Sequence, residues 1–423
     1  MIDVKRIIED IDNVEKGLLK RLSSEEFNLG EIVDLYEKRK ELQLAYDTKR
    51  AKQKEFNDQM ANIEKGSDEF KELLVDLKKR SNEVKDIELK LREVDEELKS
   101  KLEVLPNIPD EDVVGGGKEN NEIVKEYGKK PEFKFDIKDH VELGNELGIL
   151  DLERATKISG NNFSMYRGLG ARLEWALINY FIDYHLEGGY EMIIPPNLVT
   201  RDSAYTAGQL PKFEGDVYWT KDGMCLIPTA ETVLTNIYRD EILEEGELPK
   251  KFFAYTPCYR KEAGSYRANE KGLIRMHQFN KVEMYQFVKE GDSEEALNEL
   301  VKRGETLVEG LGLHYRTTKL AAGDCSAVAA KTYDIEVYIP SLEQYYEVSS
   351  ASNVRDYQAR RGNMRYRSED GDKPKYLHTL NASGLATSRL MVALLETYQL
   401  EDGSIEIPEV LRKYVGGIDK ITK

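Results

Sequence analysis

A long stretch without helix breakers limits the possible folds of this chain more than any other feature. Residues 32–105 contain no proline and a single glycine, Gly66, and they are rich in leucine, lysine and glutamate, which favour helix. Alternate steps of three and four residues from Phe70 reach eleven positions, of which nine are apolar. The same count from Ile32 gives seven apolar positions in ten. These heptad patterns predict two helices that pack along one seam.

The polar segment 64–68 lies between the two patterns, so we expect an antiparallel coiled-coil hairpin. With arms of about 30–35 residues, the hairpin would be about 50 Å long. A structure this thin has no core of its own and must project from a larger body. The repeat alone fits a spacer or a dimerisation coil equally well.

The helical pattern ends at Pro106-Asn107-Ile108-Pro109, and three glycines follow at 115–117. We therefore expect an N-terminal domain over residues 1–105, with the hairpin at about 32–105, a linker over 106–125 and a globular domain over 126–423. In this last part, β-branched runs such as 327–339 alternate with helical patterns such as 171–187 and 294–309. The chain contains neither a G-x-x-x-x-G-K-[ST] phosphate loop nor a strand-flanked G-x-G-x-x-G.

The composition excludes several classes of protein. The net charge of −17 disfavours non-specific adhesion to nucleic acid or anionic membranes, although it allows a local basic groove. The three cysteines, Cys225, Cys258 and Cys325, are far apart and form no C-x-x-C pair, so we expect packing thiols, a reduced cytoplasmic location and no zinc site. We find no apolar signal core and no run long enough to span a bilayer.

Residues 257–287 carry the first candidate site. The strand-like segment KFFAYTPCYRKE leads into a polar loop at 263–271 and returns as RMHQFNKVEMYQF, which predicts an antiparallel hairpin with a long loop. Arg260 and Glu262 share one side of the first strand, and Arg275, Phe279, Lys281 and Glu283 share one side of the second. Such a face suits an anionic, planar, amine-bearing ligand, although a salt-bridged solvent face would have the same pattern.

Two shorter segments add oxygen ligands and a third arginine. In Tyr346-Glu347-Val348-Ser349-Ser350, alternation places Glu347 and Ser349 on one face, and a carboxylate with hydroxyls beside phosphates would suit Mg²⁺. Residues 381–389 read NASGLATSR and precede an apolar helix, so Arg389 lies in its first turn. Because an arginine there opposes the helix dipole, we expect an anion to hold it.

These three segments resemble motifs 2 and 3 of the class II aminoacyl-tRNA synthetases, in the form found in seryl-tRNA synthetases. Motif 1 of that class, which builds its dimer, resembles residues 189–196. Further segments typical of the family are TAGQLPKF, LIPTAE, RDEIL, GLIRMHQF, AAKTYDIEVYIP, SNVRDYQARR and HTLNASGLA, and the resemblance covers nearly the whole chain. It implies a fold of class α+β, in which helices flank the antiparallel β-sheet of class II synthetases and a coiled-coil hairpin precedes it.

The resemblance also implies roles for individual residues. Arg260, Arg275 and Arg389 would be catalytic and would bind the phosphates of ATP, with Arg260 also holding the carboxylate of serine. Glu262 would contact the adenine amino group and Phe279 its ring, and Glu347 with Ser350 would hold Mg²⁺. The ATP site would further include Lys261, Val348 and Ser349. The serine pocket would consist of Thr229, Ala230, Glu231, Glu283, Asn381 and Ser383; which of its two glutamates binds the serine amine and which the hydroxyl stays open.

The function implied is ATP-dependent activation of L-serine and its transfer to tRNA(Ser), with tRNA(Sec) as a second acceptor, by a homodimer without a membrane anchor. In this family the hairpin contacts the long variable arm of the tRNA. The chain carries lysines and arginines on both arms that could bind phosphates, at 49, 50, 52 and 54 and at 78–80. The loop SYRANEKG departs from the usual spelling of the motif 2 loop. The alternatives are a paralogue that loads a carrier protein, although such relatives lack the hairpin, and a non-catalytic coiled-coil assembly protein.

Overall fold

The computed structural model describes residues 1–60, 63–262, 271–368, 371 and 373–423. The chain divides into two compact units, one formed by Ile2–Pro106 and the other by Asn107–Lys423 together with Met1. The polar loop expected at 263–271, which includes most of the divergent segment SYRANEKG, lies almost entirely outside the described residues.

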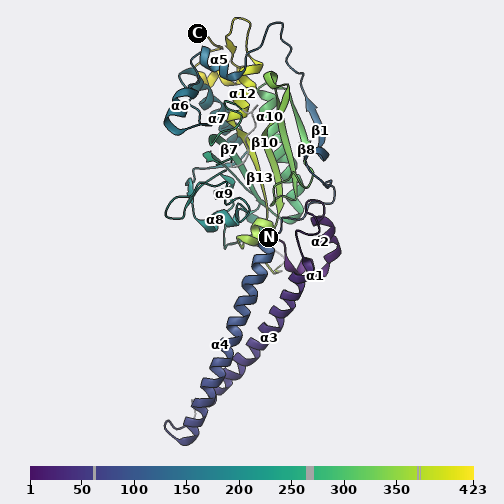
Figure 1. Ribbon diagram of the computed structural model, residues 1–423, viewed down its shortest axis with the longest axis vertical. Coiled ribbons are helices and arrows are strands. Elements are labelled where there is room, and N and C mark those ends of the chain that lie inside the picture. Colours follow the sequence, from purple (N-terminus) through teal and green to yellow (C-terminus); the bar gives the residue numbers. More distant parts are fainter. Residues whose placement is uncertain (61–62, 263–270, 369–370, 372) are drawn as a thin grey trace. The chain divides into compact units, whose positions relative to one another are not determined.

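The N-terminal unit is helical, and its described residues form two short and two long helices (Figure 1). They are α1 (Val4–Glu9), α2 (Ile11–Leu18), α3 (Leu29–Met60) and α4 (Asp68–Glu103). The Ser67 hydroxyl caps α4 by accepting a hydrogen bond from the Phe70 backbone N–H. The 36 residues of α4 correspond to a length of about 54 Å.

Charged residues at the predicted seam positions reach across the hairpin. Arg39 bonds to Asp95 at 2.5 Å, Lys49 to Glu83 at 2.6 Å and Lys101 to Glu31 at 2.8 Å. At a further seam position, the Arg80 guanidinium lies 4.4 Å from the centre of the Phe56 ring. Because each contact joins an early residue of α3 to a late residue of α4 or the reverse, the two helices run antiparallel. This confirms the predicted coiled-coil hairpin.

The second unit is built on an eight-stranded sheet with the strand order β1-β8-β9-β10-β13-β7-β6-β2. All neighbours are antiparallel except β2 and β6. The strands are β1 (Glu122–Tyr127), β2 (Glu191–Ile193), β6 (Lys250–Tyr259), β7 (Gln278–Val288), β8 (Tyr315–Lys319), β9 (Lys331–Ile339), β10 (Gln344–Arg355) and β13 (His378–Ala386). The predicted hairpin is present as β6 and β7, and Arg275 precedes the strand on which it was expected.

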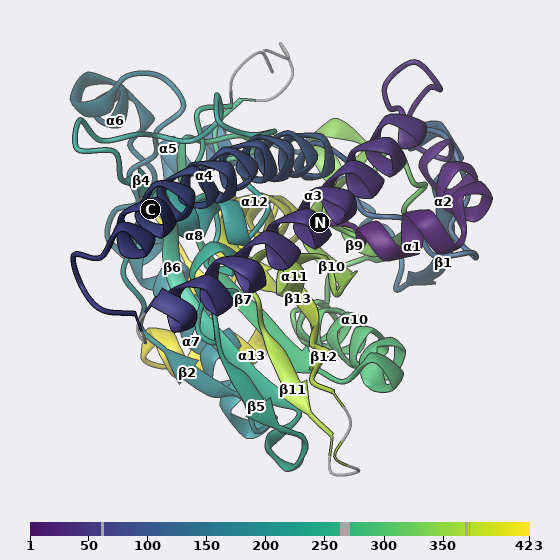
Figure 2. The same ribbon diagram turned by 90° about the horizontal axis from the view of Figure 1, so that it is seen from below.

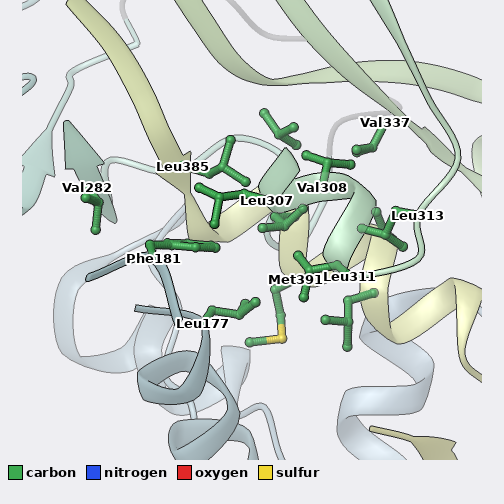
Figure 3. Packing of buried hydrophobic residues seen from close by; sticks show 14 of the residues in the cluster. Leu177, Phe181, Val282, Leu307, Val308, Leu311, Leu313, Val337, Leu385 and Met391 are labelled. Atoms are coloured by element: carbon green, nitrogen blue, oxygen red, sulfur yellow. The ribbon is translucent and has the colours of Figure 1, made fainter. Parts of the chain in front are cut away.

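Helices on one face of this sheet supply much of the main core, whose buried side chains pack closely together (Figure 3). These helices are α7 (Leu169–Glu187), α10 (Ser293–Gly310) and α12 (Thr387–Thr397). Leu177 and Phe181 of α7 pack with Leu307 of α10 and Met391 of α12, beside Val282 of β7. Alternate residues of β7 therefore point into this core, and Glu283, Tyr285 and Phe287 point to the opposite face.

The opposite face is only partly covered. Ala230, just before α9 (Glu231–Leu234), Leu234 of α9 and Ala359 of α11 (Tyr357–Arg361) pack on Tyr285 and Phe287. A small sheet of β12 (Lys375–Tyr376), β11 (Arg365–Arg367) and β5 (Ile242–Glu244) joins this layer, and β11 and β5 lie side by side (Figure 2). This cover lies over residues 285–287 of β7.

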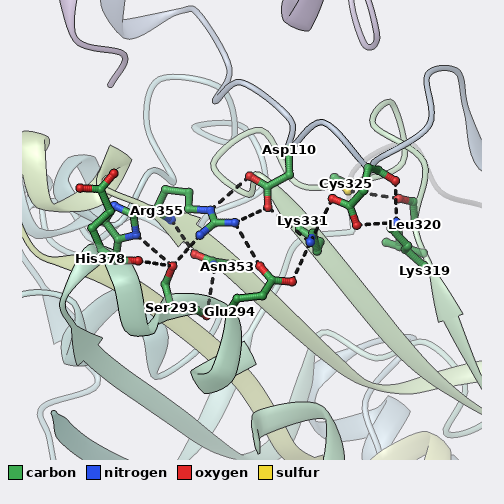
Figure 4. Close-up of polar contacts among 12 residues, drawn as sticks. Asp110, Ser293, Glu294, Lys319, Leu320, Cys325, Lys331, Asn353, Arg355 and His378 are labelled. Atoms are coloured by element: carbon green, nitrogen blue, oxygen red, sulfur yellow. Dashed lines mark hydrogen bonds and ion pairs between the residues drawn. The ribbon is translucent and has the colours of Figure 1, made fainter. Parts of the chain in front are cut away.

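The segment after Pro106, expected to be a linker, is bonded to the sheet. The Asn107 side chain donates to the backbone carbonyls of Val328 and Val354. Asp110 accepts two hydrogen bonds from Arg355 of β10, and Glu294 of α10 bridges Arg355 and Lys331 (Figure 4). These buried and half-buried ion pairs fix the start of the second unit to its central strands.

The remaining elements are short. They are α5 (His140–Glu146), α6 (Leu152–Ser159), α8 (Arg201–Thr206), α13 (Glu409–Arg412), β3 (Leu198–Val199), β4 (Cys225–Leu226), β14 (Ile405–Glu406) and β15 (Lys420–Ile421), with single 3₁₀ turns at 118–120, 245–247, 290–292, 340–342 and 413–415. Among the helices in the described ranges, none has the length and apolar character needed to cross a membrane.

Candidate active site

Two adjoining hollows on the open face of the sheet form one cleft. Their volumes are about 430 Å³ and about 80 Å³. Five residues line both: Arg260, Glu262, Lys281, Glu347 and Ser383. The larger hollow extends toward α9 and the smaller one toward the start of α12, so the cleft has two chemically different ends.

Arg260 lies where the two hollows meet. It follows the last residue of β6, and its backbone N–H donates to the carbonyl of His277 at 2.9 Å. Its guanidinium Nε donates to the carbonyl of Pro228, and the group lies 5.2 Å from the centre of the Phe279 ring. The ring and the backbone therefore hold a planar cation at the centre of the cleft, with further N–H groups available to an anion.

The smaller hollow contains two more arginines. Arg275 bonds to the Glu262 carboxylate. Arg389, in the first turn of α12, donates to the carbonyls of Ile274 and Glu347, and its guanidinium lies 3.6 Å from the Glu347 carboxylate. The expectation that an anion holds Arg389 therefore agrees with its contact to Glu347. Three guanidinium groups from separate elements line one cleft, which suits a ligand with several negative charges.

A β-bulge in β10 determines which residues face the cleft. The pairing with β9 shifts between Glu347, which lies opposite Glu336, and Ser349, which lies opposite Ile335. The extra residue reverses the alternation, so Glu347 and Ser350 line the cleft, and the Ser349 hydroxyl donates to the Ser383 carbonyl at 2.6 Å. The alternation that placed Ser349 beside Glu347 is wrong, because it assumed a regular strand.

The residues around this bulge fit a divalent cation that shares its ligands with phosphate and water. Glu347 and Ser350 supply oxygen, and Asp334 lies opposite Ser350 across the strands, with a buried Oδ1 that has no hydrogen-bond partner. Burial, and next the Glu347 carboxylate, raise the pKa of Asp334. No cluster of three His, Cys, Asp or Glu residues in the described ranges could hold a metal unaided. This donor set suits Mg²⁺, which keeps several waters and binds substrate phosphates.

The larger hollow ends in a small polar pocket. Glu283 on β7 is fully buried, and its carboxylate bonds to the Lys281 ammonium. It also accepts hydrogen bonds from the Thr229 hydroxyl at 3.1 Å and the Asn381 amide at 3.2 Å. One cation and two neutral donors therefore surround this buried carboxylate.

A second carboxylate, Glu231 at the start of α9, lies in the same pocket. Burial, and next the Glu283 charge, raise the pKa of Glu231 to about 7, against the smaller effects of Lys281 and Arg260. Its Oε1 accepts a hydrogen bond from the Gln358 amide at 2.8 Å. Two adjacent acids with different environments can interact with an ammonium and a hydroxyl in one small ligand.

The structure brings most of the predicted site residues into this cleft. Those that line it are Thr229, Glu231, Arg260, Glu262, Arg275, Phe279, Glu283, Glu347, Val348, Ser350, Asn381, Ser383 and Arg389. The side chains of Ala230, Ser349 and Lys261 are not part of its lining. Ala230 packs in the core beside α9, and the Lys261 ammonium lies 5.7 Å from the Tyr218 ring centre.

Sequence reasoning assigned no role to Asp334, Lys281 or Gln358. Lys281 was placed on the predicted face between Phe279 and Glu283 but received no role of its own there. Asp334 and Gln358 carry no local signal, since their partners lie on other strands and helices.

Comparisons with known proteins fit this geometry. Residues 1–109 match the family model of the seryl-tRNA synthetase N-terminal domain, and residues 214–398 match that of the tRNA synthetase class II core domain for G, H, P, S and T. The serine–tRNA ligase 2 of Clostridium acetobutylicum is 53% identical over 98% of this chain and 99% of its own. The chain belongs to the seryl-tRNA synthetase family.

Other members of the seryl-tRNA synthetase family agree. The serine–tRNA ligase of Kosmotoga olearia is 48% identical over 98% of this chain and 99% of its own. The crystal structure of seryl-tRNA synthetase from Pyrococcus horikoshii complexed with ATP has a TM-score of 0.92 at 33% identity, covering 100% of this chain and 99% of that one. The family membership and the α+β class II fold predicted from the sequence are thus confirmed.

Proposed function

We propose that this seryl-tRNA synthetase family member is a serine–tRNA ligase, which forms seryl-adenylate from L-serine and ATP and passes the seryl group to the 3′ end of tRNA. The observation that carries this proposal is the connection of the two hollows at Arg260. An arginine-lined hollow suited to phosphates opens directly onto a small pocket lined by Glu231 and Glu283. Relatives that match over full length are named serine–tRNA ligases.

In this proposal the ATP lies along the arginines. Arg260 binds the α-phosphate and the serine carboxylate, and Arg275 with Arg389 binds the outer phosphates. The Phe279 ring stacks on adenine, and Glu262 accepts from its amino group, which requires Glu262 to exchange its bond to Arg275 for the base. Lys261, Val348 and Ser349 flank these groups and contribute through their backbone.

Glu347 and Ser350 would hold Mg²⁺, which would screen the charge of the phosphates when bound. Their position on the cleft face of β10 supports this assignment. The protein residues then position the reactants: the serine carboxylate oxygen attacks the α-phosphorus, and the bond to pyrophosphate breaks. No protein nucleophile takes part, because orientation by Arg260 and charge neutralisation by the three arginines lower the barrier.

The serine pocket would consist of Thr229, Glu231, Glu283, Asn381 and Ser383, with Ala230 supporting it from the core. Alanine would leave buried acceptors unpaired, at a cost of about 1–3 kcal/mol for a neutral group and more for a charged one. Threonine would be excluded because its extra methyl has no room. The bonds from Thr229 and Asn381 to Glu283 support this, since they restrict movement of the pocket walls.

The tRNA would bind through the hairpin of α3 and α4. Lys49 and Arg80 make contacts across the hairpin. Among the basic residues predicted to contact the tRNA, Arg50, Lys52, Lys54, Lys78 and Lys79 are exposed and could contact phosphates. We propose tRNA(Ser) as the acceptor and tRNA(Sec) as a second one, because a hairpin that reads RNA shape does not depend on one anticodon. In this proposal residues 1–105 bind the tRNA, residues 106–125 form the connection, and residues 126–423 form the catalytic domain. No observation favours a carrier-protein substrate or a purely structural role.

We further propose a homodimer joined through the segment resembling motif 1. Large apolar side chains are exposed on α7, at the end of β2 and on β3: Trp175 is 53% exposed, Ile194 86% and Leu198 40%. A cytoplasmic location is supported by the three cysteines, which are buried and unpaired and would stay reduced there.

Two reactions of purified protein test the proposed function: serine-dependent ATP–pyrophosphate exchange and charging of tRNA(Ser). Arg260→Ala should abolish both, because the α-phosphate and the serine carboxylate lose their shared cation. Arg367→Ala is the matched control, since Arg367 is exposed on the small sheet and pairs with Glu244. Equal activity of the Arg260→Ala and wild-type proteins would refute the proposed role of the cleft.

A further inference from the structure

A buried glutamine behind the serine pocket uses its complete hydrogen-bonding capacity. Gln358, on α11, is inaccessible to solvent. Its amide nitrogen donates to the Ala207 carbonyl at 2.9 Å and to Glu231 Oε1 at 2.8 Å. Its amide oxygen accepts from the hydroxyls of Tyr285 and Thr379, both at 2.8 Å. No other hydrogen bond is available to this side chain.

The orientation of this amide follows from the chemistry of its neighbours. The Ala207 carbonyl can only accept a hydrogen bond, so the NH₂ group of Gln358 must face it. The second N–H of the same group then points at Glu231. Glu231 Oε1 is therefore an acceptor in every state, and a proton on this carboxyl group can lie only on Oε2.

The partners of Gln358 belong to the elements that build the serine pocket. Tyr285 lies two residues beyond Glu283 on β7, and Thr379 lies two residues before Asn381 on β13, so each pair shares a face. Ala207 directly follows α8, close in sequence to the cleft residue Gln209. One side chain thus joins four segments of the pocket wall.

We propose that Gln358 is a positioning residue for serine recognition: it fixes Glu231 Oε1 and leaves Oε2 as the one oxygen that can read the hydrogen-bonding groups of serine. This rests on the proposed function, because it assumes that serine occupies the pocket. Gln358 itself does not touch the substrate. Its effect is to give Glu231 one orientation and one possible proton position.

The electrostatics of the pocket make that effect measurable. The groups that face Glu231 are Glu283 and Lys281 from β7, Arg260 after β6, and Gln358 from α11. Glu283 raises the pKa of Glu231, and Lys281, Gln358 and Arg260 lower it. Removing the Gln358 donor should therefore raise the pKa of Glu231 further. Loss of a glutamine that only supports the fold would leave this pKa unchanged.

The test measures serine-dependent exchange from pH 5.5 to 8.5 with Gln358→Met and Gln358→Glu. Gln358→Met removes all four bonds at similar size. Gln358→Glu keeps the acceptor for Tyr285 and Thr379 and removes both amide N–H donors, leaving at most one O–H donor when the new carboxyl group is protonated. We expect the KM for serine to rise about tenfold or more, because a hydrogen bond to a charged group is lost. The KM for ATP should stay within about twofold, and the pH inflection in kcat/KM for serine should move upward. Two variants are used so that a folding defect in one leaves the other informative.

Gln286→Met is the matched control. Gln286, on β7, is buried like Gln358, and it bonds to Tyr190 and Glu299, outside the pocket. A serine KM and a pH inflection that are unchanged in both Gln358 variants, or a KM that rises equally in Gln286→Met, would overturn the proposal. If the wild-type protein itself shows no serine-dependent exchange, the proposed function fails instead, so the two failures are distinguishable.

Discussion

Two carboxylates that share a buried pocket repel each other unless a cation or a proton compensates one of them. Glu283 has the Lys281 ammonium and two neutral donors, and Glu231 has one amide. The pKa of Glu231 is accordingly raised to about 7 from an ordinary value of 4.5. The pocket therefore contains one acid, Glu231, whose pKa lies near neutrality, beside a second carboxylate that bonds to a lysine.

This difference predicts a pH-dependent stability. Between pH 4.5 and pH 7 the folded protein binds a proton on Glu231 that the unfolded chain has lost, so stability falls as pH rises through this window. The loss from this group should reach about 3 kcal/mol by pH 8. Glu231→Gln should abolish it, as measured by urea unfolding at pH 5 and pH 8.

Glu343→Gln, outside the cleft at the turn before β10, should keep the pH dependence of the wild type. An unchanged difference between pH 5 and pH 8 in Glu231→Gln would show that Glu231 titrates as it does in the unfolded chain.

The sequence allowed the arginines and acids of the cleft to be predicted, because strand alternation and the family motifs place them. It did not reveal Gln358 or Asp334. The roles of a buried amide and of a carboxyl group with one unsatisfied buried oxygen depend on partners on other elements, and no local spacing encodes those partners.

At the scale of elements, the hairpin of β6 and β7 followed from alternating apolar residues, and the bulge in β10 did not. A single extra residue at Glu347–Ser349 leaves the apolar pattern almost unchanged and still exchanges the two faces of the strand. The predicted strand was therefore present. Strand alternation alone placed the wrong serine beside Glu347, whereas the family resemblance had named Ser350, which lines the cleft.

The bulge predicts opposite effects for two neighbouring serines. Ser350→Ala should raise the Mg²⁺ concentration needed for half-maximal exchange several-fold, because it removes an oxygen from the cleft. Ser349→Ala should leave that concentration unchanged and lower the free energy of unfolding by about 1–3 kcal/mol, because the Ser383 carbonyl loses its buried donor. A magnesium titration of the exchange reaction, with chemical unfolding of both variants, checks this. A higher magnesium requirement in Ser349→Ala, with a loss of stability in Ser350→Ala, would mean that Ser349 faces the cleft.

At the scale of the whole molecule, the chain combines the unit that contains the cleft with a long helical hairpin. The basic residues at the hairpin seam form salt bridges within the hairpin: Arg39, Lys49 and Lys101 each pair with an acid on the opposite helix. Its exposed lysines and arginines are the ones that an RNA backbone could reach, so we expect exchange and tRNA charging to be separable.

Replacing residues 40–94 with a short Gly/Ser loop tests this separation. Arg39 and Asp95 bond across the hairpin, so the new ends lie close together and the base of the hairpin is kept. Serine-dependent exchange should stay within about twofold of the wild type, and charging of tRNA(Ser) should fall by more than about 100-fold, because the phosphate contacts are lost. Normal charging by the shortened protein would refute a role of the hairpin in tRNA binding.

The central claim is that one cleft holds ATP against its three arginines and selects serine with Glu231 and Glu283. The most direct test is ATP–pyrophosphate exchange with each of the twenty amino acids in turn. The account predicts strong exchange with serine and background exchange with threonine, alanine and glycine. Exchange that is driven best by another amino acid, or by none, would contradict it.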